Sequence, residues 1–304
     1  MKIYIKTPFF NSSKYMPHLV EHIANNSINL DKFDYLNFIH NSVLTTFSTY
    51  TLLDLPDYYD IDKYLEKIFS ELDEKLIKSE KKVLKEELKK TNYNYILFEK
   101  IGKKIYGKFF NNNGISKVTT QEVKDYHKKY YNKSNIIICD EDFNIINSSY
   151  VFNNERQNIK LEKNRFKLKI NGYNNYVIAD YYNNWQEYYL FFFLEELFNS
   201  YFEYNYRFLK REYYYSQEAY FFRTDELNFF VISGVFDIDF DREFFDKFKE
   251  IFIKIVFFTY GGKGKILNKL FLGVDISDTQ ILDYINSIDY NNIKEFLGER
   301  KDYN

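Results

Sequence analysis

The sequence is poor in cysteine and has no surplus of charge of either sign. The single cysteine, Cys139, cannot form an internal disulfide, and its place in the apolar run NIIICD predicts a buried strand residue. The chain has 42 lysines and arginines against 44 aspartates and glutamates, which gives a net charge of −2. Because a basic surplus supplies most of the affinity of nucleic-acid-binding proteins, this balance argues against a nucleic-acid partner.

Long apolar runs are also missing. The most apolar stretch, YYLFFFLEELF, is interrupted by Glu195 and Glu196, well short of the roughly 20 residues that span a bilayer. The N-terminal residues MKIYIKTPFF lack the apolar segment and the cleavage site of a signal peptide. These absences predict a protein that has no membrane span and lies in the cytoplasm.

What is present is the composition of a folded chain. Its 304 residues are 45% hydrophobic and 28% charged, which excludes a disordered protein and suffices for about two domains. Tyrosine, phenylalanine and tryptophan make up 21% of the residues. At that frequency, no single aromatic residue is evidence of a site.

The first half of the sequence alternates between strand and helix patterns. Strands are predicted at residues 2–6, 42–55 and 135–140, where apolar and β-branched residues gather. A helix is predicted at residues 14–26, with Pro17 in its first turn, and another at 118–131, with Thr120, two residues before Glu122, as its cap. Residues 60–90 carry apolar side chains at spacings of three and four, which predicts one or two amphipathic helices.

The second half repeats this order. A strand is predicted at about 165–180, a long helix at about 184–212, two strands around RTDEL, and helices at about 241–257 and 277–297. The polar, aperiodic stretch 147–164 predicts an interdomain connection. We therefore expect an α+β protein of two related domains, residues 1–150 and 151–304, each a mainly antiparallel sheet packed with helices.

Histidine is scarce, and its distribution points to a metal. Two of the four histidines lie in the pentapeptide HLVEH, as His18 and His22. On a helix they are one turn apart on one face, where both can bind Zn²⁺. Glu21 lies on the same side and can act as a general base, so the order H-x-x-E-H contains the parts of the inverted zinc motif. The other histidines, His40 and His127, lack such company and are predicted to be structural.

A catalytic zinc needs a third protein ligand. The segment SEKKVLKEELKK offers Glu80 and Glu87, which are two helical turns apart on one face. Glu87 can bind the metal while Glu80 supports a ligand from behind. Glu86, about 100° around the helix, is an alternative that these considerations leave open.

These motifs resemble the insulinase/pitrilysin family of zinc metallopeptidases, the inverzincins, and especially its short, mitochondrial-processing-peptidase-like bacterial half-molecules. HLVEH resembles the family's zinc motif, and EKKVLKEE resembles its E-x-x-V-x-x-x-E segment, which selects Glu87 over Glu86 as ligand. The segment NSVLTTFSTYT is similar to the family strand that borders the substrate cleft, with matches at Asn41 and Thr49.

In the second half, SYFEYNYRFLKREYY resembles the family's S-x-L…R…Y segment. Its matching positions are Ser200, Phe202, Arg207 and Tyr214, with Arg211 and Tyr215 as close alternatives to the last two. The resemblance implies that such an arginine and tyrosine bind substrate and come from the other half of the enzyme or from a partner chain.

The resemblance implies a function as well as a fold. The chain would be one half of a clam-shell zinc endopeptidase that hydrolyses peptides or unfolded segments inside a chamber, with Glu21 as base. It would pair with itself as a homodimer, or with a related half-molecule as a heterodimer. A narrower expectation is the processing of a small ribosomally made peptide. The alternative is a non-catalytic scaffold or partner subunit, which the family also contains.

Overall fold

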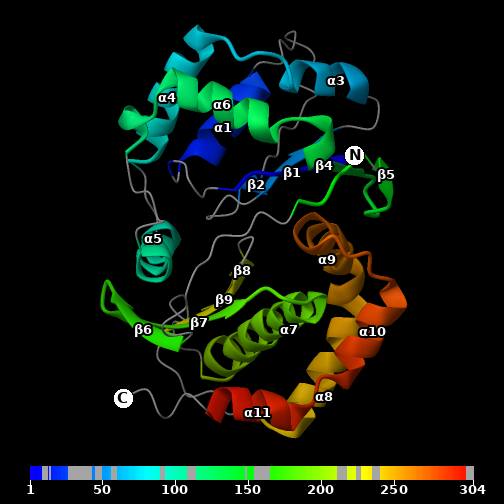
Figure 1. Cartoon of the computed structure of the whole chain (residues 1–304). Helices are drawn as coiled ribbons and strands as arrows, with labels where there is room; N and C mark the ends of the chain where they lie inside the picture. The colour runs from blue at the N-terminus through cyan, green and yellow to red at the C-terminus, as the bar shows by residue number, and fades with distance from the viewer. Residues whose placement is uncertain are drawn as a thin grey trace. The chain divides into compact units, whose positions relative to one another are not determined.

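The computed structural model forms two compact units, Met1–Ile159 and Lys160–Asn304. It describes residues 1–8, 13, 15–26, 43–44, 50–55, 60–89, 93–107, 114–147, 149–153, 165–210, 218–223, 227–234 and 240–298. Each unit contains one antiparallel sheet with helices packed against it (Figure 1). The predicted α+β class is therefore confirmed.

The first unit is built on a five-stranded sheet in the order β2-β3-β1-β4-β5. Its strands are β1 (Lys2–Lys6), β2 (Val43–Leu44), β3 (Tyr50–Asp54), β4 (Ile136–Cys139) and β5 (Ile145–Asn147). The N-terminal strand β1 lies in the middle, where Ile3 pairs with Leu53 on one side and Ile138 on the other. All four residues of β4 are buried, including Cys139, whose pKa is raised to about 12 by burial. Cys139 is thus the buried strand residue that was predicted.

The helices α1, α4 and α6 cover one face of this sheet (Figure 1). The α-helices of the unit are α1 (Met16–Asn26), α3 (Ile61–Ile68), α4 (Glu74–Glu87), α5 (Tyr93–Tyr106) and α6 (Thr120–Tyr130). Side chains of Asp60, Asp73 and Thr119 cap α3, α4 and α6, and Thr119 forms a capping box with Glu122. The cap of α6 is therefore Thr119 rather than the predicted Thr120. The long region from residue 60 to 90 is two helices, because Asp73 starts a new one.

The second unit has a four-stranded sheet in the order β6-β7-β9-β8. Its strands are β6 (Arg165–Ile170), β7 (Tyr173–Tyr181), β8 (Glu218–Arg223) and β9 (Leu227–Ser233). We predicted one strand at 165–180, but the structure has a hairpin there. Asn171 and Gly172 turn the chain with φ of 49° and 88°, the left-handed conformation that an Asn-Gly pair adopts readily.

The helices of the second unit lie before β8 and after β9 along the chain. They are α7 (Trp185–Phe202), the π-helical segment η4 (Glu203–Leu209), α8 (Arg242–Ile251), the π-helical segment η5 (Phe252–Val256), α9 (Phe257–Leu272), α10 (Asp278–Ser287) and α11 (Tyr290–Gly298). Figure 1 shows α7 between the sheet and α8–α10. Aromatic side chains fill this layer; Phe193, for example, makes ring contacts with Phe245, Phe248 and Phe252.

Several predicted boundaries in the second unit were wrong. The helix predicted at 241–257 continues to Leu272, and the one predicted at 277–297 is divided into α10 and α11. In the first unit, α5 and β5 were not predicted at all. No helix among the described residues combines the length and the apolar character that crossing a bilayer requires.

Candidate metal centre

Helix α1 presents the two histidines of HLVEH on one side. Leu19, Val20, Ile23 and Ala24 of this helix are buried in the core of the unit, so its orientation is set by packing. His18 and His22, one turn apart, lie at the edge of this buried face and are partly exposed. Their Nε2 atoms are 3.1 Å apart. Two lone pairs that are directed at one point repel each other unless a proton or a cation lies between them.

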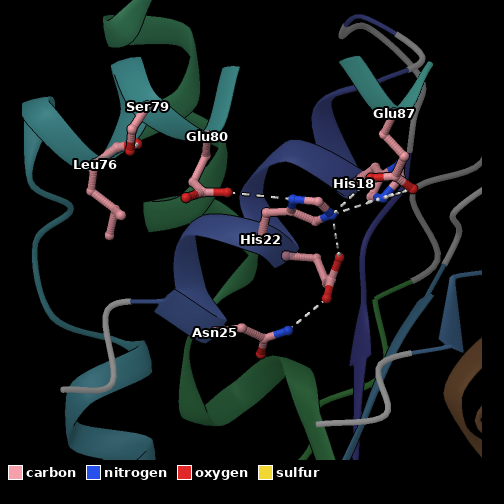
Figure 2. A network of polar contacts seen from close by, with 8 residues as sticks. His18, His22, Asn25, Leu76, Ser79, Glu80 and Glu87 are labelled. Atoms are coloured by element: carbon pink, nitrogen blue, oxygen red, sulfur yellow. Dashed lines mark hydrogen bonds and ion pairs between the residues drawn. The ribbon is translucent and has the colours of Figure 1, made fainter. Parts of the chain in front are cut away.

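Helix α4 brings the carboxylates to these histidines. Its buried residues, Ile77, Glu80 and Leu84, form a stripe at spacings of three and four, and Glu87 extends this stripe by three residues. Glu87 Oε2 is 3.5 Å from His22 Nε2, and Glu87 Oε1 is 3.7 Å from His18 Nε2. Figure 2 shows Glu87 and His18 together on one side of the His22 ring. Packing of α4 against α1 therefore assembles a group that the two helices could not form separately.

The three residues fit a zinc ion. A tetrahedral zinc with bonds of about 2.0–2.2 Å separates neighbouring ligand atoms by roughly 3.3–3.6 Å. The distances of 3.1, 3.5 and 3.7 Å between the side chains of His18, His22 and Glu87 are close to this range. Among the described residues, these three form the only group of three or more histidine, cysteine or acidic side chains that could hold a metal. Two nitrogens and one oxygen also match the chemistry that zinc prefers.

The protonation state of His18 suits metal binding. The pKa of His18 is lowered to about 4, mainly by burial and also by the nearby His22, while the charge of Glu87 acts in the opposite direction. At neutral pH the imidazole of His18 is therefore uncharged and has a lone pair to donate.

Glu80 lies on the far side of the His22 ring. It is 7% exposed, and its Oε2 is 3.5 Å from His22 Nδ1, on the other side of the His22 ring from His18 and Glu87 (Figure 2). A carboxylate in this place favours the tautomer of His22 that has its proton on Nδ1, which leaves Nε2 free of a proton. Glu80 is thus within reach of His22, and its supporting role stays a prediction.

Glu21 is buried beside the group without being one of its three members. It is 4% exposed, and its Oε2 is 3.9 Å from His22 Nε2. Its Oε1 accepts a hydrogen bond of 2.6 Å from the Asn25 side chain. On the inner side lies Tyr131, whose pKa is raised first by burial and then by the negative charge of Glu21. A carboxylate at this distance can act on a molecule bound at the group.

The alternative ligand Glu86 points away from the histidines. It follows Leu84 by two residues, about 200° around the helix, and its carboxylate pairs with Lys89 at 2.7 Å. His127 is buried in α6, where its Nε2 lies 2.6 Å from the Ile68 carbonyl oxygen and its ring stacks on Tyr131. It has the environment of a structural histidine.

The remaining predicted site residues are only partly described. Arg207 lies in η4 of the second unit, where it is exposed and pairs with Glu203 at 3.2 Å. Asn41, Thr49, Tyr214 and the alternatives Arg211 and Tyr215 lie outside the described residues, as does His40.

Two neighbours of the site were not identified from the sequence. Asn25 contacts Glu21, and its spacing of four residues from Glu21 on a helix is the signal that indicates this contact. Tyr131 lies at the end of α6, and no local pattern connects it with Glu21. A local signal that we did not use also favours Glu87 over Glu86. Ile77 and Leu84 define the buried face of α4, and Glu87, three residues after Leu84, lies on that face.

The fold and the site together define an α+β chain of two sheet-and-helix units that carries a candidate metal centre in its first unit. A protease from Helicobacter pylori has this fold: it is 15% identical, with a TM-score of 0.59, over 98% of this chain and 90% of that chain. A peptidase M16 inactive domain from Pseudomonas fluorescens aligns at 11% identity with a TM-score of 0.47, over 100% of this chain and 86% of that one. No protein-family model and no curated protein matches the sequence.

Proposed function

We propose that the chain is a zinc-dependent endopeptidase. The observation that carries this proposal is the convergence of His18, His22 and Glu87 from two helices, with the buried carboxylate of Glu21 beside them. Zinc held there would polarise a peptide carbonyl. It would also lower the pKa of water to about 7, so that hydroxide is available to attack the carbonyl at neutral pH. The likeness of the fold to that of a protease supports the same class of reaction.

Each residue has a distinct part in this proposal. His18, His22 and Glu87 hold the metal, and Glu80 orients the His22 ring through Nδ1. Glu21 accepts the proton of the attacking water and returns it to the amine that leaves when the peptide bond breaks. Its position, close to His22 but outside the set of three, suits a base better than a ligand.

The substrates would be peptides or unfolded segments, and a small ribosomally made peptide is the narrowest candidate. An extended peptide would add to a strand edge in the region of Asn41 and Thr49, where backbone hydrogen bonds give affinity without strict sequence demands. Arg207 and Tyr214, or Arg211 and Tyr215, would bind substrate from the other half of a chamber. The chain would form that chamber as a homodimer or with a related half-molecule, as the family resemblance implies.

The substitution Glu21→Gln tests the assignment of the base. It keeps the shape of the side chain and removes the proton acceptor, so zinc content should remain and peptide hydrolysis should fall by about 10²–10⁴-fold. Peptide-library digestion and metal analysis of protein purified without added zinc measure the two quantities. Full turnover in Glu21→Gln would refute the role of Glu21. Wild-type protein that neither contains nor takes up zinc would instead favour the non-catalytic scaffold.

A further inference from the structure

Asn25 contacts the Glu21 carboxylate from the next turn of α1. Its amide nitrogen donates a hydrogen bond of 2.6 Å to Glu21 Oε1. The other end of the same side chain, Oδ1, is buried and has no hydrogen-bond partner among the described residues. Asparagine is also a weak helix former. Asn25 therefore adds little to the stability of the helix, and its Oδ1 makes no hydrogen bond. Its clear contribution is the hydrogen bond to Glu21.

Glu21 lies close to His22 without belonging to the group of three. Its Oε2 is 3.9 Å from His22 Nε2, whereas two ligands of one tetrahedral zinc are separated by roughly 3.3–3.6 Å. The carboxylate lies outside the group of His18, His22 and Glu87, and a movement toward the point between these three residues would make it a fourth ligand. A fourth protein ligand would occupy the place that a catalytic site keeps open for water. Whether Glu21 is a base or a ligand thus depends on where this one side chain is held.

We propose that Asn25 is a positioning residue that holds the Glu21 carboxylate away from the metal position and so keeps Glu21 a base. This inference rests on the proposed function, because it assumes that His18, His22 and Glu87 bind zinc. The hydrogen bond fixes Oε1, and since the two oxygens of a carboxylate move together, it also restrains Oε2. Asn25 acts through Glu21, the side chain to which it donates its hydrogen bond, and not by binding the metal itself.

Metal affinity tests this role independently of peptide hydrolysis. Asn25→Leu removes the amide and nearly keeps the side-chain volume. Asn25→Ala also removes the amide, and because alanine is a strong helix former the helix is not weakened. Both variants are compared with the wild type. Without the restraint, Glu21 becomes a fourth ligand, and Zn²⁺ affinity measured by competition with a chelator should rise by at least about tenfold, the scale of outer-residue effects on metal sites. At the same time kcat should fall while KM stays unchanged. Asn26→Ala, the next residue on the helix and an exposed one, is the matched control and should alter neither quantity.

A second background separates positioning from a general effect on the helix. In Glu21→Gln protein the carboxylate is gone, so adding Asn25→Leu should leave Zn²⁺ affinity unchanged. An equal rise in both backgrounds, or no rise in the wild-type background, would overturn the role of Asn25 and leave the proposed function standing. If the wild-type protein does not bind Zn²⁺ in the same titration, the proposed function is refuted and this inference fails with it.

Discussion

The neighbouring glutamates at the end of α4 allow a paired test of the metal centre. Glu87 reaches both histidines, with oxygen-to-nitrogen distances of 3.5 and 3.7 Å, whereas Glu86 pairs with Lys89 on the far side of the helix. Glu87→Gln and Glu86→Gln are the same chemical change one residue apart. They should therefore have similar effects on the helix and different effects on metal binding.

The size of the difference follows from the number of ligands. Four-ligand structural zinc sites bind with about 10–16 kcal/mol at pH 7, or roughly 2.5–4 kcal/mol per ligand. At about 1.4 kcal/mol per tenfold change, the loss of one ligand weakens binding by on the order of 10²–10³-fold. The Glu87 side chain is 52% exposed, so water can take its place, and glutamine keeps a neutral oxygen. We therefore expect Glu87→Gln to lie near the lower limit, at roughly a hundredfold.

The assay is titration of metal-free protein with Zn²⁺ against a chelator of known affinity. Glu86→Gln should bind Zn²⁺ as the wild type does and should lose no more than the 0–1 kcal/mol of stability that an exposed ion pair contributes, measured by urea unfolding of the metal-free protein. Equal affinities for Glu87→Gln and wild type, or a larger loss in Glu86→Gln, would refute the assignment of Glu87.

Two further predictions concern buried carboxyl groups. Glu80→Gln removes the charge behind His22 Nδ1 and should weaken Zn²⁺ binding by about 10–100-fold in the same titration; unchanged affinity would exclude a supporting role for Glu80. In the second unit, burial raises the pKa of Glu195 to about 8 from an ordinary 4.5, so its neutral form is the stable one in the fold. Stability should therefore fall by at most about 1.4 kcal/mol per pH unit between these values as pH rises, and Glu195→Gln should remove this slope in urea unfolding. An identical slope in the variant would contradict the assignment.

Local signals in the sequence were sufficient for much of the first unit. The spacing of His18, Glu21 and His22 determined that they share one face of a helix, because a helical turn is a local property of the chain. The apolar run around Cys139 correctly indicated a buried strand, and strand and helix patterns gave the α+β class. The errors in the second unit include local signals that we overlooked, such as the Asn171-Gly172 turn, whose sequence predicts a hairpin.

Other features depend on contacts between segments far apart in the sequence. Helical spacing placed Glu80 and Glu87 on one face of α4, but only the packing of α4 against α1 brings Glu87 to His18 and Glu80 to the back of His22. Tyr131 reaches Glu21 only because α6 packs against α1. The sequence by itself therefore determined which side chains α1 can offer to a metal, since helix geometry is local. The approach of Glu87 to the two histidines and the surroundings of Glu21 were decided by tertiary structure, since distances of a few ångströms between separate helices depend on the packing of the whole core.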